Sequence, residues 1–376
     1  MKEFLKKPIV KLLIEFVITF VIYRKVYRPL LHKYFWRLYD RDDQIFNDIL
    51  HTVLVVYAIY FISKCFYKLV IQNEGMRSFL KNLFTSLYFV VFLLLFLELI
   101  FTYVPKSQIV DSTLASKNWF AYYWKINYKG FRDTYFSEKD TAKKKIAFIG
   151  DSFTEGHGIK HNSERFSDVV GKTLADKYSF YNLGICGMNS NDEYAQLQKF
   201  PFKPDVVVLQ YYGNDIEDLD TTAKQKFNFA PFADSNNLTY AIVSNSYLAN
   251  YIFWLYPHGK YGDYYQYMSS LYNNPILIKK HLATLNKFVE YCRQRNALLI
   301  AVVIPFLQVD MKKSDMYMMP VVSFFKQNNI PVVNVAEFAG NFPVRERVVN
   351  SNDMHASVMF NKIIADSITN IINRAK

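Results

Sequence analysis

The chain of 376 residues is 51% hydrophobic and 18% aromatic. This composition is too apolar for an intrinsically disordered protein, and the length exceeds that of a single small domain. Residues 1–104 carry 14 Lys and Arg and 8 Asp and Glu, an excess of 6 that is half of the net charge of +12. Because this charge adjoins apolar segments rather than clustering on a soluble face, it argues against nucleic acid as a partner.

The first 104 residues are predicted to form a transmembrane region with three α-helical spans. The clearest is Leu83–Val104, whose 22 residues include one charge, Glu98. At 1.5 Å per residue it is long enough to cross a hydrocarbon core of about 30 Å. We expect a second span over Ile49–Ile71 and a first over Ile9–Tyr23. The first is interrupted by charged residues, so an interfacial amphipathic helix is its alternative.

The basic residues between these spans predict an orientation. With the N-terminus in the cytoplasm, eight Lys and Arg lie on the inner side and six lie outside. We therefore expect a multi-pass protein of the inner (cytoplasmic) membrane that has membrane lipid as a partner. The domain that follows is expected to be extracytoplasmic.

Residues 105–144 read as a connector in which NYKGFRD forms a turn against the domain edge. From 145 to 376, apolar strands alternate with amphipathic helices, a pattern typical of a parallel sheet with crossover helices on both faces. The predicted helices cover about 164–176, 190–199, 277–296, 313–328 and 357–374, and the later strands cover 297–305 and 330–335.

The most informative stretch of the chain is IAFIGDSFTEGHG, an apolar strand that ends in Gly-Asp-Ser. Ligands of open α/β sheets bind beyond the carboxyl ends of the strands, so Ser152 stands where a nucleophile would stand. Ser152 and Glu155 also fit a capping box, in which the serine only caps a helix. The stretch alone leaves both interpretations open.

Three further blocks supply what a serine nucleophile needs, which is a base and donors for an oxyanion. At the end of FYNLGICG, Gly187 can present a backbone N–H, and within PDVVVLQYYGND, Asn214 can present its side-chain amide. Near the C-terminus, SNDMHAS places His355 in a loop before an amphipathic helix, with Asp353 two residues ahead. His355 is therefore the candidate general base.

These blocks, in this order, resemble the SGNH/GDSL hydrolase family over roughly 145–376. The resemblance implies a flavodoxin-like parallel sheet of five strands with flanking helices, here preceded by the transmembrane region. It implies that Ser152 is the nucleophile and His355 the base. It also implies that the Ser152 N–H, Gly187 and Asn214 form the oxyanion hole. Many members of the family are membrane-tethered and act on envelope glycans or lipids.

Two positions depart from the family pattern. Tyr212 stands where the family usually has a glycine, two places before Asn214. The last block is commonly Asp-x-x-His, but here Asn352 lies three residues before His355 and Asp353 lies two before it. We favour Asp353 as the third catalytic residue because a carboxylate stabilises an imidazolium. Asn352, or no third residue, is the alternative.

Motifs for other chemistries are missing from the sequence. A lipase-type elbow needs glycine where Thr154 stands, and there is no Walker A, His-Glu-x-x-His or Cys-x-x-Cys motif. We therefore expect no cofactor and no metal. His157 and His161 could line the site entrance, but solvent-facing loop positions are favoured for both. Asp151 is expected to fix the turn through hydrogen bonds to backbone N–H groups.

An insertion at about 217–276 is expected to determine substrate choice, because its many Tyr, Phe and Trp residues suit stacking on sugars or a bilayer interface. The alternative is a separate small core.

Three functions follow from these patterns. The leading one is a membrane-anchored serine esterase that removes an acyl group, with acetyl favoured, from an extracytoplasmic glycan or lipid-linked sugar. The second is an O-acyltransferase that passes the group to a cell-envelope polysaccharide with a membrane partner as acyl donor. The third is a non-catalytic scaffold or binding protein.

Overall fold

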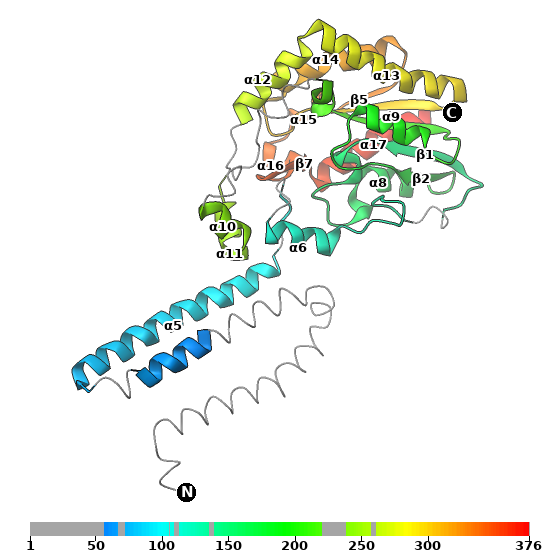
Figure 1. Cartoon of the computed structure of the whole chain (residues 1–376). Coiled ribbons are helices and arrows are strands. Elements are labelled where there is room, and N and C mark those ends of the chain that lie inside the picture. Colours follow the sequence, from blue (N-terminus) through cyan, green and yellow to red (C-terminus); the bar gives the residue numbers. More distant parts are fainter. Residues whose placement is uncertain are drawn as a thin grey trace. The chain divides into compact units, whose positions relative to one another are not determined.

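The computed structural model describes residues 56–66, 72–104, 106–108, 113–134, 139–219, 238–256 and 261–375 (Figure 1). The chain divides into two compact units, Met1–Val104 and Pro105–Lys376.

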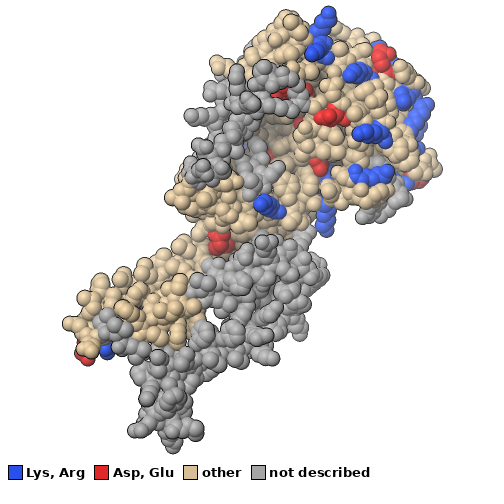
Figure 2. All heavy atoms as spheres, viewed as in Figure 1, with Lys and Arg blue, Asp and Glu red and all other residues tan. Residues whose placement is uncertain are grey.

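The first unit contains a long apolar helix, α5 (Glu74–Thr102), which begins where the Asn73 side chain accepts a hydrogen bond from the backbone N–H of Met76. In Figure 2 its exposed side is uncharged except toward its two ends. Among the described residues it is the one helix long and apolar enough to cross a membrane, and the apolar helix Val56–Phe66 is shorter.

The helix α5 begins before the predicted span Leu83–Val104 and ends within it. Of the second predicted span, only Val56–Phe66 lies among the described residues as a helix. Its Ser63 hydroxyl lies 3.1 Å from the Tyr88 hydroxyl on α5. The first predicted span, Ile9–Tyr23, lies outside the described residues.

The second unit is built on five parallel strands, which confirms the predicted fold class. The strands lie in the flavodoxin-like order β2-β1-β3-β4-β5, and all of the pairs are parallel. The strand order switches between β1 and β3, because β2 is added on one side of β1 and β3 on the other. Their bounds are β1 (Lys144–Ile149), β2 (Tyr178–Asn182), β3 (Val206–Tyr212), β4 (Leu298–Ile304) and β5 (Val332–Asn334).

Helices cover both faces of this sheet because each central strand is apolar on both sides (Figure 1). In β1, Ala147 and Ile149 point into one buried cluster, whereas Ile146 and Phe148 point into the other. The first cluster includes residues of α9 (Ser190–Gln198), α12 (Tyr261–Tyr272), α13 (Pro275–Arg295) and α14 (Met311–Gln327). The second includes residues of α8 (Phe166–Thr173) and α17 (Val358–Arg374).

The long elements lie close to their predicted positions, but the segment around the candidate base differs. His355 was expected in a loop, whereas it lies on β7 (Asp353–Ala356), which pairs antiparallel with β6 (Val348–Asn350). Alternating burial in a short hairpin gives too few residues for a periodic signal. The other short elements are α7 (Ser152–Glu155), η3 (Asn162–Glu164), η4 (Gly213–Leu219), α15 (Ala336–Ala339) and α16 (Val344–Arg347).

The aromatic insertion contains α10 (Leu238–Ser244), α11 (Tyr247–Phe253) and α12, between segments outside the described residues. Four buried residues of α12 belong to the first of the two buried clusters of the sheet, and they are Tyr264, Met268, Leu271 and Tyr272. Val243 and Trp254 form a separate small cluster. The alternative of a separate core therefore applies to α10 and α11 and does not apply to α12.

The connector contributes a helix, α6 (Leu114–Tyr123), that the sequence did not predict. The predicted turn is present, since the backbone N–H of Asn127 donates to the carbonyl of Phe131 at 2.7 Å. Arg132, which follows the turn, is fully buried and donates to the carbonyls of Gly156 and Ile159. The connector is therefore packed against the loop that follows Ser152.

Candidate active site

Ser152 is the first residue of α7, directly beyond the carboxyl end of β1. The N-cap of α7 is Asp151, whose carboxylate accepts a hydrogen bond from the backbone N–H of Phe153 at 2.9 Å. The capping-box interpretation of Ser152 is therefore wrong. Glu155 takes no part in capping at Ser152, because its carboxylate accepts from the backbone N–H of Cys186. The Ser152 hydroxyl is left for other contacts.

The turn before the serine is held from the neighbouring strand. Gln210 on β3 accepts hydrogen bonds through its Oε1 from the Asp151 N–H at 3.2 Å and the Thr154 hydroxyl at 2.9 Å. A Cβ at Gly150 would lie 2.2 Å from Thr154 Oγ1 and 2.4 Å from Gln210 Oε1, so only glycine fits there. Burial raises the pKa of Asp151 to about 6. These contacts agree with a turn-fixing role for Asp151.

The structure brings Ser152, His355 and Asp353 into contact. The Nε2 of His355 lies 2.7 Å from Ser152 Oγ, and its Nδ1 lies 2.6 Å from Asp353 Oδ1. The alternative third residue, Asn352, points elsewhere, because its Nδ2 donates to the carbonyl of Trp254 at 2.8 Å. This chain of alcohol, imidazole and carboxylate can activate a serine for attack on an acyl group.

The electrostatics of the site suit a base. Burial lowers the pKa of His355 below its ordinary 6.5, and the positive charge of a protonated His157 lowers it further, although Asp353 opposes both effects. His355 is therefore neutral at pH 7 and able to accept a proton. Burial acts to raise the pKa of Asp353, but the facing imidazoles of His355 and His157 hold it well below its usual range. Asp353 is therefore ionised.

The two candidate oxyanion donors lie beyond the strands that flank β1. Gly187 follows β2 and is exposed, and Asn214 follows β3 at the start of η4. The backbone N–H of Ile185 donates to the carbonyl of Gly150 at 3.2 Å, which holds the loop before Gly187 beside the serine turn. Because the three strands are parallel neighbours, Ser152, Gly187 and Asn214 reach the same edge of the sheet.

Sequence reasoning placed His157 in a solvent-facing loop, and the structure contradicts this. His157 is buried, and its Nδ1 lies 3.1 Å from Asp353 Oδ2. His161, by contrast, is exposed as expected. The Ser107 hydroxyl also donates to Asp353 Oδ2. His157 lies close to Ser152 in the sequence, and this proximity could have identified it as a site residue. Nothing in the sequence identifies Ser107 as one.

Three of these residues are also spaced as metal ligands could be. Ligand atoms of His157, Asp353 and His355 all lie within 4.8 Å of one another. Both oxygens of Asp353 already accept hydrogen bonds, and His355 contacts Ser152. A metal ion bound here would compete with the contacts that activate the serine, so the arrangement fits the alcohol–imidazole–carboxylate chain better.

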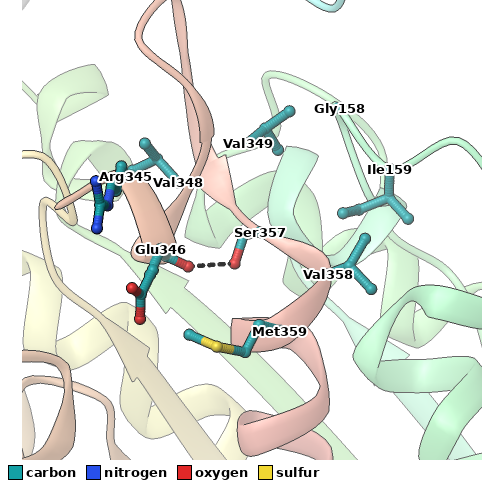
Figure 3. Close-up of a pocket in the computed structure, with 9 residues that line it drawn as sticks. All are labelled: Gly158, Ile159, Arg345, Glu346, Val348, Val349, Ser357, Val358 and Met359. Atoms are coloured by element: carbon teal, nitrogen blue, oxygen red, sulfur yellow. Dashed lines mark hydrogen bonds between the residues drawn. The ribbon is translucent and has the colours of Figure 1, made fainter. Parts of the chain in front are cut away.

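A cavity of about 370 Å³ is lined by residues of α16, β6 and the start of α17 together with Gly158 and Ile159. Figure 3 shows these residues around the cavity. Its walls are mostly apolar, and the Ser357 hydroxyl at its edge donates to the carbonyl of Glu346. Ser152, Asp353 and His355 do not line it. The cavity is therefore separate from the cluster around the serine.

The model of the GDSL-like lipase/acylhydrolase family matches residues 148–357. No curated protein is significantly similar to the chain.

Solved structures that resemble the chain have low sequence identity. A lipolytic protein of the G-D-S-L family from Desulfitobacterium hafniense is 15% identical, with 61% of this chain and 99% of that one covered and a TM-score of 0.38. A lipase/acylhydrolase from Enterococcus faecalis is 14% identical, with 62% and 96% covered and a TM-score of 0.38. A mutant acetylxylan esterase from Geobacillus stearothermophilus is 16% identical, with 61% and 94% covered and a TM-score of 0.39.

The family match spans more than half of the chain and contains all four blocks that carry Ser152, Gly187, Asn214 and His355. The chain therefore belongs to the GDSL-like lipase/acylhydrolase family and is a serine hydrolase.

Proposed function

We propose that this serine hydrolase is a membrane-anchored esterase that removes an acetyl group from an extracytoplasmic glycan or lipid-linked sugar. The observation that carries the proposal is the chain of contacts from Ser152 Oγ to His355 Nε2 at 2.7 Å and from His355 Nδ1 to Asp353 at 2.6 Å. This arrangement is suited to forming an acyl-serine intermediate.

In the first half-reaction, His355 takes the proton of the Ser152 hydroxyl while the oxygen attacks the ester carbonyl carbon. The ionised Asp353 stabilises the imidazolium that forms. When the tetrahedral intermediate collapses, the imidazolium returns the proton to the leaving sugar oxygen, and an acetyl-serine remains. Water, deprotonated by His355, then attacks this ester, and the imidazolium returns the proton to the Ser152 oxygen as acetate leaves.

The negative charge of the tetrahedral intermediate needs donors fixed in advance. We assign this role to the backbone N–H groups of Ser152 and Gly187 and to the side-chain amide of Asn214, which reach the same edge of the sheet. The loss of one such donor costs about 10²- to 10³-fold in kcat.

A small acyl group is supported by aromatic rings beside the base. The Phe153 ring lies 4.8 Å from the His355 ring and 4.5 Å from that of Tyr212, the residue at the position where the family usually has glycine. The Tyr212 ring packs 5.2 Å from Phe306. These rings leave less room for a long acyl chain than a glycine would.

A sugar substrate is supported by a contact between these aromatic rings and the aromatic insertion. Phe306 lies 5.2 Å from Tyr265 on α12. Phe306 is fully buried, so the half-buried Tyr265 supplies the aromatic face that suits stacking on a pyranose ring.

Membrane anchoring is supported by α5, whose apolar side chains are exposed along its length. A helix of this kind is stable where lipid replaces water. We propose that it anchors the enzyme in the cytoplasmic membrane. The charge balance of the loops favours an extracytoplasmic hydrolase unit.

Labelling with a fluorophosphonate probe tests the enzyme and its sidedness together. We expect the wild-type protein to be labelled in intact cells by an impermeant probe and the Ser152→Ala variant to remain unlabelled. His161→Ala, which changes an exposed histidine outside the site, is the matched control and is expected to label normally. Labelling only after lysis would contradict the proposed orientation. No labelling at any pH would favour a non-catalytic scaffold.

Product analysis separates hydrolysis from transfer. With an acetylated oligosaccharide as substrate, we expect free acetate whether or not an acceptor glycan is present. Acetyl transfer to the acceptor without free acetate would instead identify an O-acyltransferase, which would need a membrane partner to supply the acyl donor.

A further inference from the structure

The two oxygens of the Asp353 carboxylate face different partners. Oδ1 accepts from the Nδ1 of His355 at 2.6 Å and from its backbone N–H at 3.2 Å. Oδ2 faces the Nδ1 of His157 at 3.1 Å and the hydroxyl of Ser107. Asp353 is fully buried, so the orientation of its carboxylate is determined by these partners.

The tautomer of His157 follows from the charge of Asp353. An ionised carboxylate only accepts hydrogen bonds, so the Nδ1 of His157 must carry the proton that lies between them. This assigns His157 as a donor to Oδ2, on the opposite side of the carboxylate from His355.

Aromatic contacts fix the plane of the His157 ring. It lies 4.4 Å from the ring of His355 and 5.9 Å from the ring of Trp119, with which it stacks at an interplanar angle of 28°. Phe120 and Trp124 meet it edge-on at 5.5 Å and 5.8 Å. The connector therefore supplies the wall that holds this ring.

The backbone ties His157 to the serine as well. Its N–H donates to the carbonyl of Ser152 at 2.8 Å. At the next residue, Gly158, a Cβ would lie 2.6 Å from Asp353 Oδ2, so a side chain there would displace the carboxylate. The backbone at Gly158 therefore lies so close to the Asp353 carboxylate that a larger residue does not fit there.

We propose that His157 is a positioning residue of the hydrolase site. By donating from Nδ1 to Oδ2, it prevents the Asp353 carboxylate from rotating and keeps Oδ1 directed at His355, which in turn is directed at Ser152. The inference rests on the proposed function, because it assigns His157 a role in the same Ser–His–Asp chain. The Nδ1 of His157 is directed at Asp353, so His157 acts on Ser152 through Asp353 and His355.

Two variants separate the donor from the ring. His157→Phe keeps an aromatic ring for stacking and removes the donor, whereas His157→Asn places an amide nitrogen where Nδ1 stood. With p-nitrophenyl acetate, we expect kcat of His157→Phe to fall about 10- to 100-fold with KM changed less than about twofold. His157→Asn should keep kcat within about fivefold of wild type. Equal losses in both, or no loss in His157→Phe, would overturn the proposal.

A double-mutant cycle tests whether His157 acts through Asp353. In an Asp353→Asn background, His157→Phe should lower kcat by less than about twofold, because the carboxylate it positions is gone. Independent losses that multiply in the double variant would contradict the proposal.

A measurement on the wild-type protein keeps the test independent of how the variants fold. Nitrogen-15 NMR of labelled histidines should show a proton on the Nδ1 of His157, assigned by the loss of its signal in His157→Asn. An Nε2-protonated tautomer would overturn the proposal. If the wild-type protein neither hydrolyses the ester nor reacts with the fluorophosphonate, the proposed function itself fails. If it does both while the variants behave like wild type, only the role of His157 fails.

Discussion

At the scale of single residues, the activity of the site depends on whether Asp353 or Asn352 faces the imidazole of His355. Asn350 pairs with Asp353 across the β6–β7 hairpin, and this short turn directs Asp353 toward His355 and Asn352 toward the carbonyl of Trp254. The sequence left both residues as candidates, because the direction of each side chain is known only when the backbone conformation is known. On a strand, two adjacent side chains point to opposite faces.

This difference gives a prediction for a pair of variants. Asp353→Asn should lower kcat by about 10²- to 10⁴-fold, because the amide lacks the charge that stabilises the imidazolium and can favour the wrong tautomer. Asn352→Ala should change kcat by less than about threefold and cost about 1 kcal/mol of stability through its lost hydrogen bond. Steady-state kinetics and thermal unfolding measure both. A larger kcat loss in Asn352→Ala would reverse the assignment.

At the scale of elements, the start of η4 is held by a buried chain of polar groups. The Tyr272 hydroxyl on α12 donates to the carbonyl of Gly213 at 3.0 Å and also contacts the hydroxyl of Tyr211. The Nε2 of His281 on α13 lies 2.9 Å from the same Tyr211 hydroxyl. The insertion therefore supports the residue that precedes Asn214.

Removing one hydroxyl tests this support. Tyr272→Phe keeps the ring and leaves the Gly213 carbonyl without its donor, which should cost about 1 kcal/mol of stability. Because Asn214 follows directly, we also expect kcat to fall by about 3- to 10-fold. Tyr291→Phe, a buried tyrosine on α13 whose ring lies under Arg295, is the matched control and should keep full activity. Unchanged kcat in Tyr272→Phe would separate the insertion from the site.

The same scale shows where pattern reading succeeds. The strand–helix alternation predicted α8, α13, α14 and α17, each of which has an apolar face that repeats with helical period, and it also predicted α9, whose buried face includes polar residues. It did not predict α6, a helix of ten residues within the connector whose buried Trp119 stacks on the ring of His157. The buried face of α6 includes the polar residues Ser116 and Asn118, so the local pattern shows no continuous apolar face.

At the scale of the whole molecule, the buried histidine on α13 couples folding of the hydrolase unit to pH. Burial lowers the pKa of His281 to about 4, so the unfolded chain binds a proton at this site between about pH 6.5 and 4 that the folded chain does not. The contribution of His281 to stability must therefore rise with pH across this window and be lost as pH falls. The difference from the ordinary value corresponds to on the order of 3 kcal/mol.

Chemical denaturation of the detergent-solubilised protein at pH 7 and pH 4.5 measures this effect. We expect wild type to lose about 2 kcal/mol more than His281→Gln over this interval, because glutamine does not titrate and most, but not all, of the titration window is crossed by pH 4.5. At pH 7 the variant should be the less stable of the two, since it does not reproduce the contact with Tyr211. Equal pH dependence in both proteins would show that His281 does not contribute.

The sequence by itself determined the parallel α/β fold, a long apolar segment before it, and the four blocks that carry Ser152, Gly187, Asn214 and His355. These depend on periodicity and on residues at strand ends, which neighbours along the chain specify. Only the tertiary structure selected Asp353 over Asn352 as the partner of His355. It alone also brought His157, and Ser107 from 246 residues away in the chain, to the same carboxylate. A buried charge takes its partners from whatever segments the whole core brings to it, and no local pattern encodes that choice.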